Sequence, residues 1–468
     1  AQDIADAQQF FGGCWLDDDN IVFAPRFAGG LWRVEATGSV PMQLTRPRGR
    51  ADAAHVWPTC LPGSRTVLYS QWRGGTQVDD SAIGYYQADT RRQGVLLAGA
   101  FHPRYLHPGT LLFVRTGTLM AAPLDLAALK LSGAARPLYA GLLANENSQV
   151  AFYETSNSGH LVFIRGRYEQ PVRRLVWVDR HGKVEPASAL RRPFSLSRIA
   201  PDGRRVATWL QDAEVAVWQL DLSLDRLSRL SRGMDDHSPV WSPDGRRVAF
   251  DSSRTGNYEI YVAASDTIGA ETAVTSRRRD HFVNAWLPDG RLAFTDHSIA
   301  EGCDLWLIEP RPDAQPELLL RTPFNESEPA FSADGRWIAY VSDDTRQKEV
   351  YVQRFPLSGP RVQVSHEGGE EPLWSRDGNE LYFRNGRQVL AALVSGDTAP
   401  RVSQPVVLFE GRFHFNLYPT NTYDVGADGR FLMVEEPAPT PRAVHVVLYL
   451  GDSWRKLASQ ASITPQMP

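Results

Sequence analysis

One short hairpin pattern constrains the fold of this chain more than any other feature. The segment from Ser238 to Phe250 reads SPVWSPDGRRVAF and places a Pro-Asp-Gly break between two apolar runs. Proline presets one turn torsion, while Asp and Gly tolerate the left-handed backbone of a tight reversal. The pattern therefore predicts two antiparallel β-strands. Two further apolar runs, at 259–262 and 272–274, complete a four-stranded unit.

The same hairpin recurs along the chain at a regular distance. Between turn glycines, six well-preserved copies are 42, 45, 45, 43 and 51 residues apart, at Gly203, Gly245, Gly290, Gly335, Gly378 and Gly429. A period of about 40–50 residues with four strands per repeat is typical of β-propeller blades. A single blade cannot bury both of its faces, so blades pack around a common axis, and closing the ring protects the strand edges.

Four less regular copies precede these six, so the sequence predicts an all-β chain, a β-propeller of about ten four-stranded antiparallel blades. The predicted units are residues 11–45, 54–97, 99–139, 148–188, 194–231, 237–275, 283–320, 327–365, 370–409 and 421–457, followed by a tail at 458–468. We expect a single large ring, with two consecutive smaller propellers as the alternative. The last unit lacks an obvious fourth strand, and we expect residues 6–11 to supply it.

Charge and composition narrow the range of partners. A net charge of −4 gives no reason to expect nucleic acid or an anionic membrane surface. No run approaches the roughly 18 apolar residues of a membrane helix, so we expect no membrane insertion by this chain, while an upstream membrane anchor stays open. The chain begins at Ala1 and not at Met, so we expect either a mature form after signal cleavage or an excised piece.

The cysteines are few. Cys14, Cys60 and Cys303 exclude a disulfide scaffold and a CxxC metal site. Cys14 and Cys60 fall in the first strands of neighbouring units, so a single disulfide between them is one alternative. We expect two buried free thiols instead.

The Trp-Ser-Pro-Asp-Gly-Arg hairpin resembles that of TolB-like (PD40, WD40-like) bacterial β-propellers. Longer strings at 175–186, 322–326, 329–342 and 371–378, with the strand 444–448, resemble the propeller half of bacterial membrane Ser/Thr protein kinases. The resemblance spans essentially the whole chain and implies an extracytoplasmic sensor, on the periplasmic or extracellular face of a bacterial membrane. Kinase chemistry does not carry over, because the chain has no Gly-rich loop with a Val-Ala-Ile-Lys strand, no His-Arg-Asp and no Asp-Phe-Gly.

Aligned repeats indicate which residues converge. First strands line the central channel of a propeller, so the position just before Pro239 should lie near the channel mouth in every blade. Imidazoles, carboxylates and aromatic rings gather at and beside this position. The candidate ligand-binding residues at this rim are His55, Trp57, His102, Arg104, His237, His281, Glu328, Glu370, Glu371 and Tyr423.

Such a rim suits a polar ligand or a divalent cation, since His nitrogens and carboxylate oxygens are metal ligands. Its residues can equally serve solvation alone. We expect no cofactor, with a divalent metal at the rim as the alternative.

The main hypothesis is a non-enzymatic sensor or binding propeller that engages a small ligand, a glycan or a protein. It is either the sensor part of a membrane Ser/Thr kinase or a free-standing relative. The alternatives are a metal-dependent glycan lyase using the same rim, implied by the TolB-like lyases that hold a metal with channel histidines, and a TolB-like interaction scaffold. The chain has no G-x-S-x-G motif, and we expect no catalytic residues.

Overall fold

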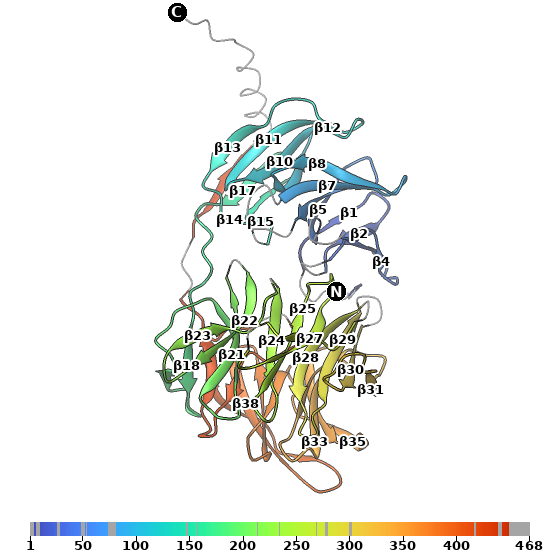
Figure 1. The fold of residues 1–468 in the computed structure, drawn as a ribbon. Helices are drawn as coiled ribbons and strands as arrows, with labels where there is room; N and C mark the ends of the chain where they lie inside the picture. The colour runs from blue at the N-terminus through green and yellow to red at the C-terminus, as the bar shows by residue number, and fades with distance from the viewer. Residues whose placement is uncertain are drawn as a thin grey trace, which may run out of the picture. The chain divides into compact units, whose positions relative to one another are not determined.

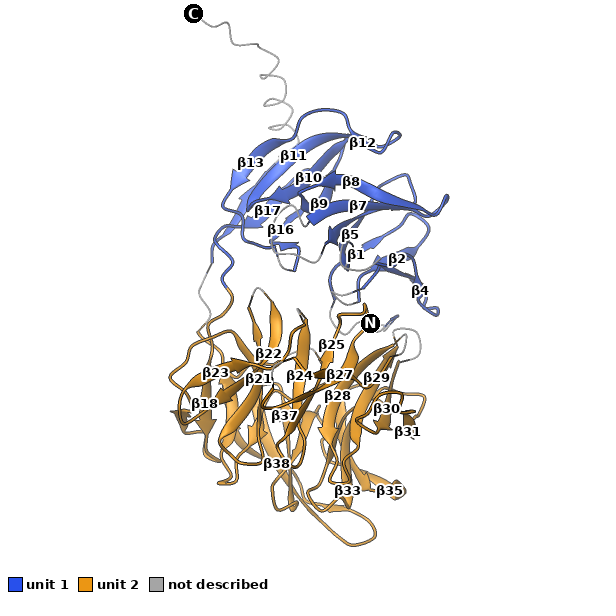
Figure 2. Ribbon diagram, in the orientation of Figure 1, with its two compact units in different colours: residues 1–169, 439–468 blue, residues 170–438 orange. Residues whose placement is uncertain are grey.

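The structure is a computed structural model. It describes residues 4–5, 10–25, 29–47, 52, 54–73, 81–146, 148–156, 158–212, 214–233, 235–267, 269–276, 279–298, 302–415, 418–438 and 442–448. Throughout these ranges the long regular elements are β-strands (Figure 1). The described residues contain no helix long and apolar enough to cross a membrane. The chain divides into two compact units, residues 1–169 with 439–468 (unit 1) and residues 170–438 (unit 2), coloured separately in Figure 2.

Unit 2 contains six antiparallel sheets, which we number as blades in the order in which they contact one another. Blade 1 is β41 (Asp424–Val425), β42 (Phe431–Glu435), β18 (Arg174–Val178) and β19 (Val184–Pro186). Blade 2 is β20 (Phe194–Ile199), β21 (Arg205–Gln211), β22 (Val215–Asp221) and β23 (Arg226–Arg229). Blade 3 is β24 (Asp236–Trp241), β25 (Arg247–Ser252), β26 (Glu259–Ala264) and β27 (Glu271–Ala273).

The other three blades of unit 2 follow in chain order. Blade 4 is β28 (Asp280–Trp286), β29 (Leu292–Ser298), β30 (Gly302–Ile308) and β31 (Glu317–Leu320). Blade 5 is β32 (Glu326–Phe331), β33 (Trp337–Ser342), β34 (Glu349–Arg354) and β35 (Ser358–Gln363). Blade 6 is β36 (Glu370–Trp374), β37 (Glu380–Asn385) and β38 (Gln388–Ser395), with β39 (Arg401–Val402) and β40 (Val406–Glu410) both paired to β38.

Contacts between these blades run in a cycle. The first strands of blades 2 to 6 contact one another in sequence, and apolar side chains fill the space between neighbouring blades. Blade 6 packs against blade 1 through Tyr382, Tyr423 and Phe431, and blade 1 packs against blade 2 through Leu175 and Phe194. Unit 2 is therefore a six-bladed propeller in which the first strands face the axis.

The described residues of unit 1 also form antiparallel sheets. The first is β1 (Gly13–Trp15), β2 (Asn20–Phe23), β3 (Trp32–Glu35) and β4 (Met42–Gln43); the second is β5 (Ala54–Cys60), β6 (Thr66–Trp72), β7 (Ser81–Gln87) and β8 (Arg92–Ala98). The third is β9 (Phe101–Leu106), β10 (Thr110–Arg115), β11 (Thr118–Asp125), β12 (Lys130–Leu131) and β13 (Arg136–Ala140). The others are β14 (Ala144–Asn145) with β15 (Val150–Ala151), and β16 (Tyr153–Thr155) with β17 (Leu161–Ile164) and β43 (Val444–Val447).

The predicted hairpin is confirmed. Strand β24 pairs with β25, and Gly245 at the turn has a φ of 67°, in the left-handed region that favours glycine. The Asp244 carboxylate accepts the Ser242 hydroxyl at 2.6 Å and the backbone N–H of Arg246 at 3.0 Å. These bonds are local, which explains why the turn could be predicted from its own residues.

The expected single large ring is not what the structure contains, because the chain divides into two units. The predicted units 148–188 and 421–457 also differ from the observed sheets. Strand β17 pairs with β43, while β18 pairs with β42, so each predicted unit contributes strands to both compact units. Strands β18 and β19 supply the outer half of blade 1, the role expected of residues 6–11, of which 6–9 lie outside the described residues. The tail 458–468 also lies outside them.

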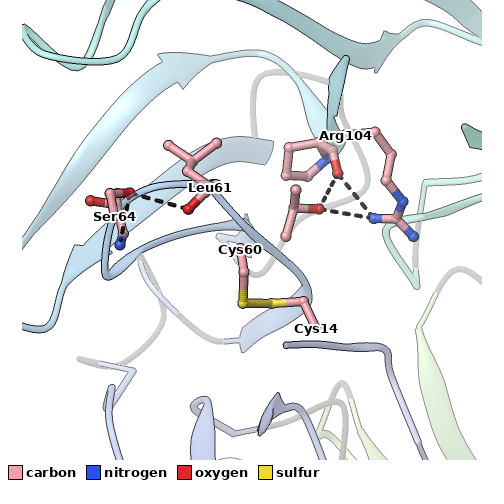
Figure 3. The surroundings of a disulfide bond; sticks show 8 residues. Cys14, Cys60, Leu61, Ser64 and Arg104 are labelled. Atoms are coloured by element: carbon pink, nitrogen blue, oxygen red, sulfur yellow. Dashed lines mark hydrogen bonds between the residues drawn. A yellow bond between two sulfur atoms is a disulfide. The ribbon is translucent and has the colours of Figure 1, made fainter. Parts of the chain in front are cut away.

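Cys14 of β1 and Cys60 of β5 form a disulfide, contrary to the expected free thiols (Figure 3). Their Cα atoms are 5.6 Å apart, and the bond links two neighbouring sheets of unit 1 across 46 residues of chain. Cys303 is buried and takes no part in a disulfide. The disulfide forms because two sheets pack side by side, and the spacing of the cysteines in the sequence could not show that packing.

Candidate functional site

The aligned position before the proline of the first strands has an unusual backbone. Its residues have left-handed φ values near 55° although none is glycine, and they are Trp57 (55°), His102 (54°), Ser238 (50°), Glu328 (56°) and Glu371 (57°). Each first strand has a register shift at this point. A left-handed residue of this kind costs about 1–2 kcal/mol, so the surrounding structure must hold it in place.

Hydrogen bonds between blades hold it. The backbone N–H of Glu328 in blade 5 donates to the Thr295 hydroxyl of blade 4 at 3.3 Å. Glu328 of blade 5 accepts the N–H of Glu371 in blade 6 at 2.6 Å, and Glu371 accepts the N–H of Thr422, beside blade 1, at 2.8 Å. The aligned position therefore joins neighbouring blades, which is a structural role that the repeat pattern alone did not reveal.

The predicted acidic residues of unit 2 take part in these contacts between neighbouring blades. Glu328 and Glu371 are each 2% exposed, and burial raises the pKa of both carboxyls, that of Glu328 to about 8 against the opposing effect of Lys348. Glu370 pairs with Lys348 at 3.2 Å. The Tyr423 hydroxyl donates to the carbonyl of Glu371 at 3.1 Å and its ring is fully buried. These side chains stabilise the propeller, and their binding of a ligand stays a prediction.

Four predicted residues belong to unit 1, so the ten do not form one ring. The His55 ring bonds Thr45 at 2.7 Å. The indole of Trp57 donates to the carbonyl of Ser148 at 2.9 Å. His102 accepts the backbone N–H of Ala151 at 3.2 Å, and burial and then Arg104 hold its pKa well below the ordinary value. Arg104 bonds Glu154 at 2.5 Å. It also donates to the carbonyl of Pro103 at 3.0 Å, a bond that Figure 3 draws as a dashed line.

His237 lies in an aromatic cluster of unit 2. Its ring stacks on Trp209 of β21 with centroids 4.5 Å apart and planes 3° apart. Its Nε2 bonds the Asp235 carboxylate at 2.8 Å, and Asp235 also accepts the Tyr258 hydroxyl at 3.0 Å. Burial opposes protonation of His237, but Asp235 outweighs it, so the pKa of His237 lies above its ordinary value. Phe282 of β28 packs on Tyr258.

The connection between blades 6 and 1 reaches this cluster from the other side of the axis. We call residues 413–415 and 418–422 of this connection the crossing segment. The Tyr418 ring lies 4.7 Å from His237, 5.9 Å from Tyr258 and 5.8 Å from Phe282. In a six-blade cycle the junction of blades 3 and 4 lies opposite the junction of blades 6 and 1, so the segment reaches across the axis to make these contacts.

Both ends of the crossing segment are anchored. Buried Arg384 donates to the carbonyl of His414 at 2.7 Å and to the Thr422 hydroxyl at 2.8 Å. Asn284 of blade 4 donates to the carbonyl of Pro419 at 2.5 Å, and Asn421 donates to the carbonyl of Pro372 at 2.6 Å. The crossing segment therefore contacts residues of blades 2, 3 and 4.

A further hydrogen-bonded chain has the connectivity of a hydrolase triad. The Ser195 hydroxyl bonds His414 Nε2 at 3.0 Å, and His414 Nδ1 bonds the Glu436 carboxylate at 2.6 Å. Burial lowers the pKa of His414, which favours the neutral ring. Ser195 has no exposed surface, however, and Arg173 holds Glu436 at 2.8 Å. We interpret these hydrogen bonds as structural contacts that hold the crossing segment against blade 2.

Several polar atoms around the cluster are buried without a hydrogen-bond partner among the described residues. They are Asp236 Oδ2, His237 Nδ1 and Thr420 Oγ1. Burial raises the pKa of Asp251 to about 7. His281 lies on the adjoining strand, with its Nε2 3.7 Å from the Asp296 carboxylate. Within the described ranges, no group of three or more His, Cys, Asp or Glu side chains could hold a metal ion.

Known proteins resemble this chain at low sequence identity. No family model matches the chain. An uncharacterized protein of Agrobacterium fabrum, Atu1656, is 24% identical over 200 residues, which cover 40% of this chain and 67% of that protein. Similar solved structures include a candidate TolB from Agrobacterium tumefaciens, with 19% identity and a TM-score of 0.47 over 58% of this chain and 100% of that one.

Two other solved structures are similar at the same level. TolB from Acinetobacter baumannii is 17% identical with a TM-score of 0.40, covering 65% of this chain and 82% of that one. An oligogalacturonate lyase from Vibrio parahaemolyticus is 12% identical with a TM-score of 0.39, covering 64% of this chain and 82% of that one.

Proposed function

We propose that this chain is a non-enzymatic binding propeller that engages a protein partner at the aromatic cluster of unit 2. One observation carries the proposal: Trp209, His237, Tyr258 and Phe282, from three successive blades, form one aromatic cluster, and His237 Nδ1 is buried in it without a hydrogen-bond partner among the described residues. Folded proteins satisfy most of their buried polar atoms, so unpartnered ones call for an explanation. Clustered Trp and Tyr rings are typical anchors of protein interfaces.

An extracytoplasmic location forms part of the proposal. Disulfides persist in oxidising compartments and are rare in the cytosol. The Cys14–Cys60 bond supports a periplasmic or extracellular site of action. Alkylation of intact cells before and after reduction tests this: the mass of the chain should increase by two thiol adducts more after reduction, because Cys14 and Cys60 then become reactive. If the number of thiol adducts is the same before and after reduction, the cysteines are already reduced and the chain is in a reducing compartment.

The sensor role and the link to a membrane Ser/Thr kinase rest on the sequence resemblance alone. The complete reading frame upstream of Ala1 tests the link. The lyase alternative requires a metal. Metal analysis of the purified chain should give far less than one equivalent if our proposal is right, and a stoichiometric divalent metal would favour the lyase.

Site-specific photocrosslinking tests the partner site. A benzophenone amino acid at Phe415, 37% exposed on the crossing segment, should crosslink a partner in the extracytoplasmic fraction of the source cells. The matched control is the same probe at Val184, 39% exposed on outer strand β19 of blade 1. We expect a defined adduct at position 415 alone. Adducts of equal yield at both positions, or at 184 alone, contradict the proposed site.

A further inference from the structure

We infer that two copies of this chain join through unit 1, with the last sheet of each copy packed on the first sheet of the other. The last sheet is β16, β17 and β43, and the first sheet is β1 to β4. Both belong to unit 1, so this surface is separate from the aromatic cluster of unit 2 that is proposed to bind a protein partner.

The sheets of unit 1 pack in series. Three apolar clusters join the first sheet to the second, the second to the third and the third to the last. Neighbouring residues of a strand point to opposite faces, so a middle sheet uses one face for each neighbour. Phe113 of β10 faces the second sheet, for example, while Leu112 faces the last sheet. No apolar cluster of the described residues contains both the first and the last sheet, so each of these two keeps one face open.

The last sheet is buried on one face. Phe163 of β17 packs against the third sheet, while its neighbour Val162 is 39% exposed. The equivalent strand of blade 1 in unit 2, β42, is at most 1% exposed from Phe431 to Val434, because neighbouring blades cover both of its faces. Val162 pairs with Val446 of β43, which is 64% exposed. The exposed apolar residues of this open face are Val162, Val444, Val446 and Leu448.

The first sheet has its open face at the other end of the series. Cys14 faces the second sheet, where it bonds Cys60, so the next residue, Trp15, points to the opposite face. Trp15 is 61% exposed. It pairs with Ile21, which is half-buried on the same face. Phe23 and Val34 of this face are buried, and its open part is Trp15, Ile21 and Trp32.

Neither open face has to bury an unpaired charge. Within β16, β17 and β43, the open face has one charged residue, Glu154, which Arg104 pairs at 2.5 Å. The strands of the first sheet place no charged residue on their open face. Packing the two faces together therefore removes apolar surface from water without desolvating a free charge.

The order of the sheets indicates why the partner is a second copy. At each interface of unit 1, the face that a sheet turns toward the next sheet meets the opposite kind of face. The last sheet has the first kind open and the first sheet has the second kind, so two copies supply each other with the matching face. A two-fold axis then makes two identical contacts and leaves neither face open. Together the four sheets of each copy give eight, within the usual range of about four to eight blades in a closed propeller.

Analytical ultracentrifugation of the full chain tests the assembly. We expect the wild type to have twice the mass of one chain. Val446→Glu and Trp15→Lys each place a charge on one open face and should weaken the dimer by about tenfold or more. The matched control is Leu224→Glu, because Leu224 is 62% exposed but lies between β22 and β23 of unit 2. This control should dimerise like the wild type.

Mixing the two variants tests which faces meet. An equimolar mixture of Val446→Glu and Trp15→Lys should recover the dimer, because one of its two contacts then has both native faces. A dimer that Trp15→Lys leaves unchanged, or a mixture that stays monomeric, overturns the proposed pairing. A wild type that is monomeric at every soluble concentration, or whose mass keeps rising with concentration, overturns the closed dimer.

Far-UV circular dichroism and the melting temperature report whether each variant is folded. Val444→Glu replaces Val446→Glu if that variant is unfolded, and Trp15→Gln likewise replaces Trp15→Lys, with the same expectations. The photocrosslink at Phe415 probes unit 2 and these substitutions probe unit 1, so the dimer and the proposed binding function can fail separately.

Discussion

The carboxylate of Glu328 accepts the backbone N–H of Glu371 at 2.6 Å, and this hydrogen bond joins blade 5 of unit 2 to blade 6. The same two residues had been predicted to bind a ligand. Both have left-handed backbones, with φ values of 56° and 57°. The Glu328 side chain thus stabilises the strained backbone of Glu371. Glu328, a polar residue on an inner strand, therefore helps to hold neighbouring blades together.

Glu328→Ala should destabilise unit 2. The substitution leaves the buried N–H of Glu371 without its acceptor, which costs about 1–3 kcal/mol. Urea unfolding followed by tryptophan fluorescence measures the loss. Glu317→Ala is the matched control, because Glu317 is an exposed glutamate of blade 4 that pairs with Arg291 at 3.2 Å. If both variants unfold at the same urea concentration as the wild type, Glu328 does not join the blades.

The pH dependence of stability should report Glu328 as well. Its pKa is raised from 4.5 to about 8 in the folded chain, so the folded state keeps a proton that the unfolded state releases. The stabilising effect of protonation is fully present below pH 4.5 and is lost as the pH rises to about 8. Glu328→Gln, which is always neutral, should match the wild type at pH 4.5 and exceed its melting temperature at pH 8. A constant difference across this range would contradict the raised pKa.

Loss of the disulfide should weaken unit 1. The bond closes a loop of 46 residues, for which removal typically costs about 2–4 kcal/mol. We expect a reductant to lower the melting temperature of the wild type and to leave the Cys14→Ser, Cys60→Ser double variant unchanged. Cys303→Ser serves as the control, since Cys303 takes no part in the disulfide and its variant should keep the response to reductant. A wild type that melts identically with and without reductant would show that the pair is not oxidised.

Ser195 should be unreactive despite its triad-like partners. Its hydroxyl bonds His414 but has no exposed surface. A fluorophosphonate probe should leave the folded chain unlabelled, and Ser195→Ala should lower stability by about 0.5–1.5 kcal/mol through the lost hydrogen bond. If the probe labels the wild type and not Ser195→Ala, Ser195 is a nucleophile, and its hydrogen bond to His414 is not merely structural.

Part of the candidate site was accessible from the sequence. Alignment of the repeats singled out the position of Ser238, Glu328 and Glu371, and the structure gives these residues one shared backbone geometry. The alignment could not show where their hydrogen bonds go, because the acceptors lie on neighbouring blades. No sequence pattern pointed to Tyr418 as a site residue. It lies outside the repeated strands, and only the path of the crossing segment brings it to His237.

The sequence by itself determined the β-strands and the tight turns between them, since a Pro-Asp-Gly turn is stabilised by atoms within a few residues of one another. Only the tertiary structure decided which strands share a sheet. Strand β17 pairs with β43 and β18 with β42 across more than half of the chain, and the Cys14–Cys60 bond likewise joins separate sheets. The physical reason is that strand edges are chemically alike, so the choice among them depends on how all the blades pack together.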